Sequence, residues 1–166
     1  MTIAKFMRVS EAQYAADQTL PDALPVEAIP LPRRATGGSA GYDFVCTADV
    51  TLHPGDAITI PTGIRCEMQP GWVLMLFPRS GLGFKHQIRL ANTVGVIDSD
   101  YFHAANEGHI MVRLTCGMSP CSMDSHDVTI QKGERFCQGV FLPHGLAEED
   151  EVAEARTGGF GSTGNV

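Results

Sequence analysis

Basic side chains are scarce in this sequence, which carries 12 Lys and Arg against 19 Asp and Glu and a formal net charge of −7. Proteins that bind nucleic acid through its backbone usually present a basic face or stripe. We therefore expect no nucleic-acid partner. An anionic substrate would need a pocket that is basic only locally and assisted by a metal ion.

Long apolar runs and paired cysteines are also missing. No run reaches the length of a membrane span, and residues 1–7 lack the long apolar core of a signal peptide. The five cysteines form an odd set without a C-x-x-C pair, which argues against a disulfide framework and against a zinc knuckle. We expect a cytoplasmic protein with reduced thiols and no membrane contact.

Glycine and proline, by contrast, supply 28 of the 166 residues and are spread along the chain, as is typical of many turns between short strands. Apolar residues alternate with more polar ones around residues 58–60, 64–68 and 110–114. The continuous apolar run at 72–77 suits a strand buried on both faces. The pattern predicts one all-β domain, a sandwich or a barrel.

One helix is expected. Ser10 to Gln13 has the form of a capping box, and the alanine-rich stretch up to Asp17 continues it. Four prolines between residues 21 and 32 then predict an extended connection that brings Arg33 and Arg34 to a glycine turn.

Two polar segments interrupt the first half of the strand pattern. Asp43 enters the first clear strand, where the alternative is an exposed carboxylate. Arg79, Ser80 and Gly81 follow the most apolar strand directly. A guanidinium, a hydroxyl and free N–H groups at a strand end are suited to an anion, although a surface turn has the same composition.

Two further polar segments follow. The apolar strand at 94–97 leads into Asp98, Asp100 and Tyr101. Carboxylates at alternate strand positions point the same way, which would supply a general base, and the alternative is a polar hairpin turn. Gln138 lies in an apolar strand that begins near Arg135, and a buried amide needs hydrogen-bond partners such as phosphate oxygens.

The segment 156–164 is rich in glycine and hydroxyl groups, with one arginine and one aromatic ring. Glycine N–H groups, hydroxyls and a guanidinium together suit a phosphate, but no helix follows to complete a P-loop. We expect it to close over a site built elsewhere. The alternative is a disordered terminus, against which Phe160 argues. With the carboxylates as Mg²⁺ ligands and base, these groups predict metal-assisted hydrolysis of a polyphosphate.

Five segments in order resemble the motifs of the trimeric dUTP diphosphatases (dUTPases). They are AGYDF at 40–44, RSGLG at 79–83, NTVGVIDSDY at 92–101, GERFCQ at 133–138 and GGFGSTG at 158–164. The resemblance implies a jelly-roll-like, distorted β-barrel over residues 1–150, with an N-terminal extension at 1–35, assembled as a homotrimer. Residues 151–166 would form a flexible arm that closes a neighbouring subunit's site. The activity that the resemblance implies is hydrolysis of dUTP to dUMP and pyrophosphate, which would limit uracil incorporation into DNA and supply dUMP for dTMP synthesis.

The resemblance also implies roles for single residues. Asp98 would activate the water that attacks the α-phosphorus, and Asp43 would hold Mg²⁺ through water. Phosphate oxygens would be bound by Arg79, Ser80, Gly81 and Gln138. Tyr101 would lie under the deoxyribose and exclude a 2′-hydroxyl. Uracil would be read by Asn92, Gly95 and Val96. The arm would supply Phe160 to stack on the base, and Arg156, Gly161, Ser162 and Thr163 to close over the phosphates.

The sequence departs from the family pattern after Tyr101, where residues 102–109 replace a shorter continuation and predict a wider uracil hairpin. In the arm, Arg156 stands one residue closer to the glycines than is common, which changes its approach to the phosphates. Two rivals stay open. One is a dCTP deaminase, alone or with linked dUTPase activity, for which Glu107 is the nearby candidate. The other is a non-catalytic relative that senses the nucleotide.

Overall fold

Short strands are the main regular structure of the computed structural model, which describes residues 1–117 and 127–150. The strands are β1 (Ala4–Arg8), β2 (Arg33–Arg34), β3 (Tyr42–Val45), β4 (Val50–Leu52), β5 (Ala57–Pro61), β6 (Ile64–Met68), β7 (Trp72–Pro78), β8 (Ile88–Leu90), β9 (Gly95–Ile97), β10 (Met111–Cys116), β11 (Val128–Ile130) and β12 (Arg135–Pro143). The predicted mostly-β architecture is confirmed.

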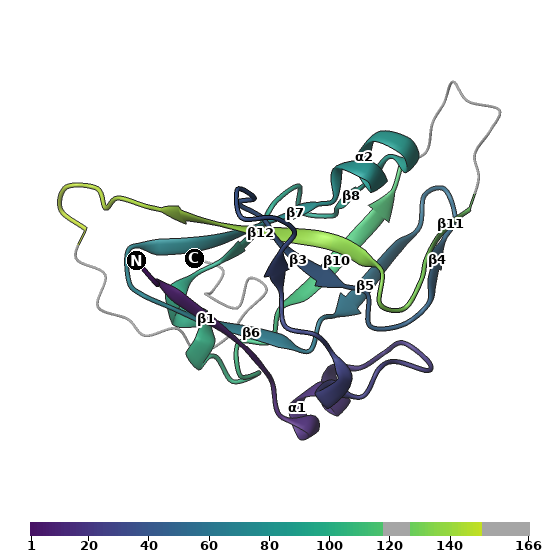
Figure 1. The fold of residues 1–166 in the computed structure, drawn as a ribbon, viewed down its shortest axis with the longest axis horizontal. Helices are drawn as coiled ribbons and strands as arrows, with labels where there is room; N and C mark the ends of the chain where they lie inside the picture. The colour runs from purple at the N-terminus through teal and green to yellow at the C-terminus, as the bar shows by residue number, and fades with distance from the viewer. Residues whose placement is uncertain (118–126, 151–166) are drawn as a thin grey trace.

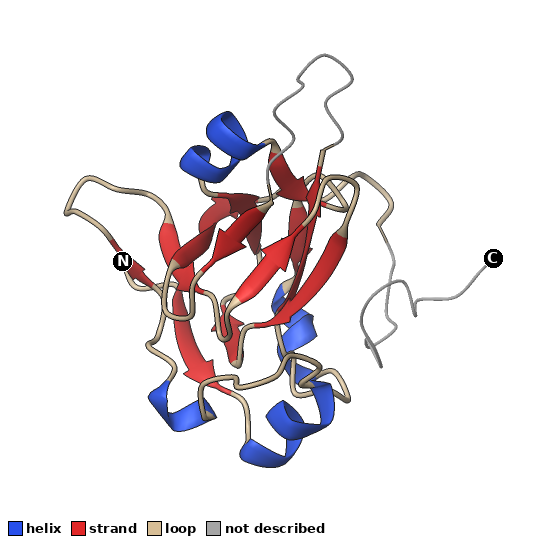
Figure 2. Cartoon of the chain, turned by 90° about the vertical axis from the view of Figure 1, so that its right-hand side faces the viewer, coloured by secondary structure: helices blue, strands red, loops and turns tan. Residues whose placement is uncertain are grey.

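Helices lie outside the strands, at the two ends of the molecule (Figure 2). They are α1 (Glu11–Asp17), α2 (Ser80–His86) and the 3₁₀ turns η1 (Val26–Ala28) and η2 (Ser99–His103). The predicted cap of α1 is confirmed, since Oγ of Ser10 accepts a 3.1 Å hydrogen bond from the backbone N–H of Gln13.

The expectation of a single helix was wrong, because residues 80–86, for which a surface turn was one alternative, also form a helix. Two glycines lower the helix propensity of this segment. The buried side chain of Leu82 nevertheless fixes the helix to the core. Gln87 ends it in the left-handed conformation with φ 54°.

The largest sheet has the strand order β2-β3-β12-β7-β9, and three smaller sheets, β5-β10-β8, β1-β6 and β11-β4, complete the fold. β12 crosses the molecule as one long strand (Figure 1). It pairs with β3 on one side and β7 on the other, so that Gln138 stands opposite both Asp43 and Phe77. The large sheet thus brings together three polar segments that are far apart in the sequence.

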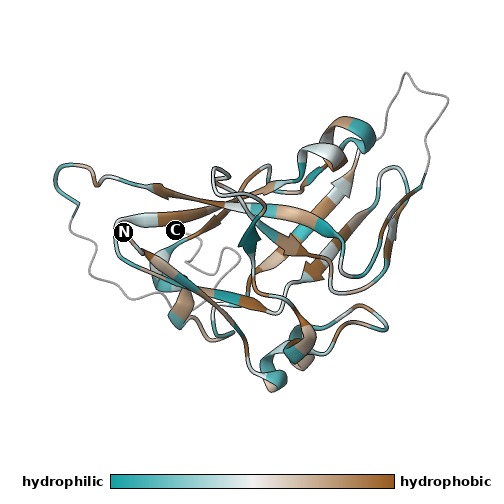
Figure 3. Ribbon diagram, in the orientation of Figure 1, coloured by the Kyte–Doolittle hydropathy of each residue, from teal (hydrophilic) through white to brown (hydrophobic). Residues whose placement is uncertain are grey.

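Hydrophobic residues concentrate on the strands (Figure 3). The prediction that β7 is buried on both faces is wrong for the single chain. Leu74 and Leu76 are buried, at 0% and 1% exposure, whereas the alternating Val73, Met75 and Phe77 are only half-buried. One face of β7 packs on the core, and the other face is partly exposed in the single chain.

The described cysteines, Cys46, Cys66, Cys116 and Cys137, are buried and free. Burial raises the pKa of Cys46 to about 11 and that of Cys66 to about 12. These thiols therefore stay protonated and pack as small apolar groups. None of the described helices is long and apolar enough to cross a membrane.

Candidate functional site

A polar pocket opens over the large sheet, where β3, β7 and β12 lie side by side. Its lining combines a few charged and amide groups with small residues from the connection before β3, and consists of Ala35, Ser39, Ala40, Gly41, Asp43, Phe77, Arg79, Ser80, Arg135, Gln138 and Val140. The predicted polar segments at 40–44, 79–83 and 133–138 all contribute to it. The structure therefore unites three of the segments that the sequence singled out.

The carboxylate of Asp43 is the acidic centre of this polar pocket. Nη1 of Arg135 donates a 3.0 Å hydrogen bond to its Oδ2, and Nε of Arg79 lies 3.9 Å from its Oδ1. The Asp43 side chain is only 12% exposed, and the two arginine side chains are 47% and 37% exposed. Both guanidinium groups thus keep donors available for an anionic ligand.

Gly41 allows Gln138 to reach the pocket wall. A Cβ atom at position 41 would lie 2.6 Å from Oε1 of Gln138. The amide occupies the space that any larger residue would need. Glycine at this position is therefore a condition for the shape of the polar pocket.

A second pocket, the hairpin pocket, lies along the turn between β8 and β9. It is largely apolar and is lined by Leu76, Leu90, Ala91, Asn92, Val94, Gly95, Val96, Ile97, Asp98, Tyr101, Met111, Val112 and Arg113. Gly95 packs tightly on β7, since a Cβ there would meet the side chain of Leu76 at 3.0 Å. A mainly apolar cleft with a carboxylate suits a flat ring held beside a reacting group.

The sequence predicted that Asp98 and Asp100 lie on the same face of a strand, and this prediction is wrong. β9 ends at Ile97, and Asp98 is the N-cap of the 3₁₀ turn that contains Asp100. A 3₁₀ turn has three residues per turn, so side chains two positions apart diverge. Asp98 accordingly lines the hairpin pocket, and Asp100 is not among its lining residues.

Tyr101 is buried, at 5% exposure, and lines the hairpin pocket. Its hydroxyl donates a 2.8 Å hydrogen bond to the carbonyl of His109 and accepts one of 2.8 Å from Nδ2 of Asn106. The polar tip thus points away from the pocket toward segment 102–109, and the residue lines the pocket with its aromatic body.

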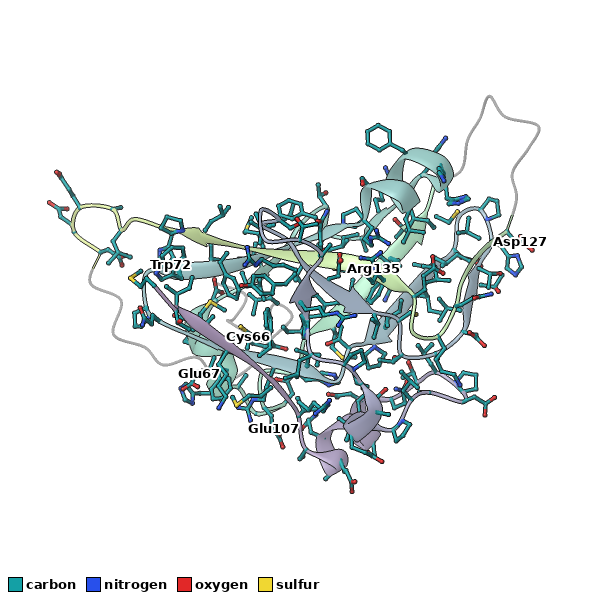
Figure 4. All side chains as sticks on the ribbon, in the orientation of Figure 1. Cys66, Glu67, Trp72, Glu107, Asp127 and Arg135 are labelled. Carbon is teal, nitrogen blue, oxygen red and sulfur yellow. The ribbon has the colours of Figure 1, made fainter. Side chains whose placement is uncertain are left out.

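The prediction of a wider hairpin was wrong. The residues that turn between β8 and β9 are 91–94, whereas the extra residues follow Tyr101 and precede β10, so they lie outside that turn. Among these extra residues, Glu107 accepts hydrogen bonds from the backbone N–H and Oγ of Ser10, at 2.9 and 2.6 Å. Figure 4 shows Glu107 at the lower edge, close to α1 and well apart from Arg135. The extension is therefore not part of the hairpin.

The predicted site residues fall into two groups. Asp43, Arg79, Ser80 and Gln138 line the polar pocket, whereas Asn92, Gly95, Val96, Asp98 and Tyr101 line the hairpin pocket. Among the described residues the two pockets have no lining residue in common. Gly81 lies in an adjoining hollow beside Arg79 and Lys85. The predicted residues of the arm, Arg156, Phe160, Gly161, Ser162 and Thr163, lie outside the described residues.

Some lining residues escaped the sequence analysis. Nothing in the side chains of Ala35 and Ser39 indicates a binding site. The predicted turn after Arg34 is the feature that places them in the polar pocket. Nη1 of Arg34 donates to the carbonyls of Gly37 and Ser39, at 2.8 and 3.0 Å, and holds that turn. Arg113 enters the hairpin pocket from β10, where it has the appearance of an exposed strand residue.

The described residues contain no group of three or more His, Cys, Asp or Glu that could enclose a metal ion. The polar pocket offers one carboxylate, Asp43, which is already ion-paired with arginine. This donor set does not suit a metal held by protein ligands alone. It fits a Mg²⁺ ion that keeps most of its waters and is bound mainly by a polyanionic ligand.

Comparison with known proteins points in one direction. The dUTPase family model matches residues 27–164. The deoxyuridine 5′-triphosphate nucleotidohydrolase of Lactococcus lactis is 44% identical over 139 residues, which cover 82% of this chain and 89% of the relative. The crystal structure of the dUTPase from Streptococcus mutans superposes with a TM-score of 0.65 at 35% identity and covers 86% of this chain and 98% of that one. The dUTPase of phage phi11 of S. aureus, described with a structural Mg(II) ion, has the same fold at 20% identity, with a TM-score of 0.64 and coverage of 92% and 98%.

Proposed function

The chain belongs to the dUTPase family, and from this premise we propose that it is a dUTP diphosphatase, which hydrolyses dUTP to dUMP and pyrophosphate. The observation that carries the proposal is the separation of the side chains into two pockets of different chemistry. One offers arginine, hydroxyl and amide donors, which suit phosphate oxygens. The other offers an apolar cleft with the Asp98 carboxylate and the Tyr101 ring, which suits a nucleoside.

We infer that a complete site needs more than one subunit. The polar pocket and the hairpin pocket have no described lining residue in common, and the outer face of β7 is only half-buried in the single chain. A homotrimer of jelly-roll-like barrels would cover that face and bring the hairpin pocket of one subunit to the polar pocket of the next. The arm at 151–166, from the third subunit, would then place Phe160 on the base and close over the phosphates with Arg156, Gly161, Ser162 and Thr163.

In the proposed mechanism, Asp98 orients a water molecule and accepts its proton as the water oxygen attacks the α-phosphorus. The bond from the α-phosphorus to the bridging oxygen breaks, and pyrophosphate leaves in line with the attack. Arg79, Ser80 and Gln138 stabilise the charge that moves onto the leaving group, assisted by backbone N–H groups near Gly81. When bound to the triphosphate, Mg²⁺ would neutralise part of its charge, with Asp43 in contact through water.

Substrate selection would take place in the hairpin pocket. The ring of Tyr101 is held on the buried side of this pocket and would leave no room for a ribose 2′-hydroxyl. Polar groups of Asn92 and the backbone at Gly95 and Val96 line the same cleft and would read the uracil edge. The buried free cysteines also favour a reducing compartment such as the cytoplasm.

The direct test is incubation of the purified full-length protein with dUTP and Mg²⁺, followed by chromatography for dUMP and an assay for pyrophosphate. We expect both products in equal amounts. A parallel incubation with dCTP tests the deaminase alternative through ammonia release. Glu107, the candidate for that reaction, lines neither pocket and is bonded to Ser10, so we expect no ammonia. Absence of pyrophosphate from dUTP would leave the nucleotide-sensing alternative.

The shared site is tested by mixing two inactive variants. Asp98→Asn damages only the hairpin pocket, and Arg79→Ala damages only the polar pocket. After the two are mixed, unfolded and refolded together, about a quarter of the sites in randomly assembled trimers would combine two intact pockets. We expect activity to return to that extent. Activity that stays at the level of the separately refolded variants would contradict a site shared between subunits.

A further inference from the structure

The hydroxyl of Tyr101 is held from two sides by segment 102–109, the part of the chain that departs from the family pattern. It donates to the carbonyl of His109 at 2.8 Å and accepts from Nδ2 of Asn106 at 2.8 Å. Only the second bond is made by a side chain. Asn106 is therefore the residue through which sequence can most directly change the environment of the Tyr101 hydroxyl.

The amide of Asn106 is itself fixed. Its Oδ1 accepts a 3.2 Å hydrogen bond from the backbone N–H of Gly108, which leaves Nδ2 directed at Tyr101. Gly108 has a φ of 69°, and a Cβ there would lie 2.6 Å from the carbonyl oxygen of Tyr101. The returning chain thus lies directly against Tyr101, and only glycine permits this approach.

The segment around Asn106 is also anchored to the body of the protein. Nη2 of Arg65 donates to the carbonyl of Phe102 at 2.7 Å, and its guanidinium lies 3.8 Å over the Phe102 ring. Glu107 is bonded to Ser10, and these hydrogen bonds lower the pKa of its carboxyl. The donor on Asn106 is therefore presented from a braced loop.

We propose that Asn106 is a positioning residue that holds the Tyr101 ring at the height where it excludes a ribose 2′-hydroxyl. The idea rests on the proposed function, since it concerns the preference for deoxyribose at that same site. Asn106 is not among the residues that line the hairpin pocket, so it would not contact the nucleotide. It would act through the hydroxyl of Tyr101. Without the hydrogen bond from Asn106, the buried ring could tilt, and the space beside the sugar would widen.

The test compares kcat/KM for dUTP and UTP in the full-length protein with Mg²⁺. Asn106→Asp keeps the acceptor for Gly108 and the shape of the side chain, but it replaces the donor to Tyr101 by an acceptor. We expect the ratio of kcat/KM for dUTP over UTP to fall by about three- to tenfold, the size of one lost hydrogen bond. Tyr101→Phe, which removes the hydroxyl and leaves Asn106 intact, should lower the ratio by a similar factor. Adding Asn106→Asp to Tyr101→Phe should then have no further effect.

Glu107→Ala is the matched control, because it lies beside Asn106 but contacts Ser10 instead of Tyr101. It should lower the melting temperature but leave the dUTP over UTP ratio unchanged, because the bond to Gly108 and the contacts of Arg65 with Phe102 still hold Asn106 in place. An unchanged ratio in folded Asn106→Asp, or an equal further loss in the Tyr101→Phe background, would overturn the proposal. If Asn106→Asp does not fold, an unchanged ratio in Tyr101→Phe overturns it in the same way. Wild-type protein without activity on dUTP would instead refute the proposed function.

Discussion

Arg135 of β12 and Asp43 of β3 are joined by a hydrogen bond, with Nη1 of Arg135 3.0 Å from Oδ2 of Asp43, although the register places Val45 opposite Arg135 and Gln138 opposite Asp43. The register of this strand pair shifts between Arg135 and Cys137, a β-bulge that re-aims the arginine. Arg79 approaches the other carboxylate oxygen at 3.9 Å. The polar pocket is therefore organised around a carboxylate that orients two guanidinium groups.

Replacing Arg135 by Lys tests whether the activity depends on the geometry of the guanidinium group. Lysine keeps the charge but not the planar fork, so it cannot hold Asp43 and an anion in the same way. We expect kcat/KM for dUTP to fall by about tenfold, with little change in melting temperature because the Arg135 side chain is 47% exposed. Arg89→Lys, at an exposed arginine that lines neither pocket, is the control. Equal activity of the two variants would contradict this function of the pair.

Asp98→Asn should abolish most turnover while nucleotide binding persists, because the amide keeps the shape of the carboxylate but cannot accept the proton of water. The expected loss in kcat is at least about 100-fold. Calorimetric titration with a non-hydrolysable dUTP analogue measures the retained binding. Asp100→Asn serves as the control, since Asp100 is not among the residues that line the hairpin pocket. A kcat of Asp98→Asn close to that of the wild type would contradict the role of Asp98 as the general base.

Gly41→Ala should damage the polar pocket without a change in charge. The added methyl group would lie 2.6 Å from Oε1 of Gln138, so the amide must turn away from the pocket wall. We expect KM for dUTP to rise about fivefold or more, with little loss of stability because the displaced atom lies at the end of a flexible side chain. Gly37→Ala is the control, because no atom lies within 4 Å of its added Cβ. Unchanged kinetics in Gly41→Ala would show that Gln138 is not needed in its observed position.

Much of this arrangement could be predicted from the sequence, because its signals are local. Strand alternation and the cap at Ser10 depend on neighbouring residues, and both are confirmed. The motif order likewise predicted which polar segments line the two pockets. The helix at Ser80–His86 could not be predicted, since it depends on the burial of Leu82 by distant parts of the chain. The divergence of Asp98 and Asp100 and the docking of Glu107 on Ser10 also follow from tertiary contacts, which no local pattern records.

The ring of His109 is fully buried and should make the stability of the fold depend on pH. Burial lowers its pKa, and the hydrogen bond with Asp17, at 2.7 Å, opposes this shift without cancelling it. Its Nε2 accepts a 2.8 Å hydrogen bond from the backbone N–H of Gly63, so protonation at that nitrogen would break the bond. The folded state therefore keeps the imidazole neutral at pH values where the unfolded chain takes up a proton.

The neutral His109 therefore stabilises the fold fully at pH values above about 6.5, the ordinary pKa of histidine in the unfolded chain. This stabilisation is lost as the pH falls through the lower pKa that His109 has in the folded protein. We expect the melting temperature to drop on acidification from about pH 7.5 to about pH 5.5, and to drop less in His109→Gln, whose amide oxygen can still accept from Gly63. His53 has the opposite effect. Its exposed hydrogen bond with Asp127 raises the pKa of His53, so this pair stabilises the folded state at acidic pH. His53→Gln should therefore steepen the drop slightly. Parallel pH profiles for wild type and His109→Gln would mean that the buried imidazole does not control this dependence.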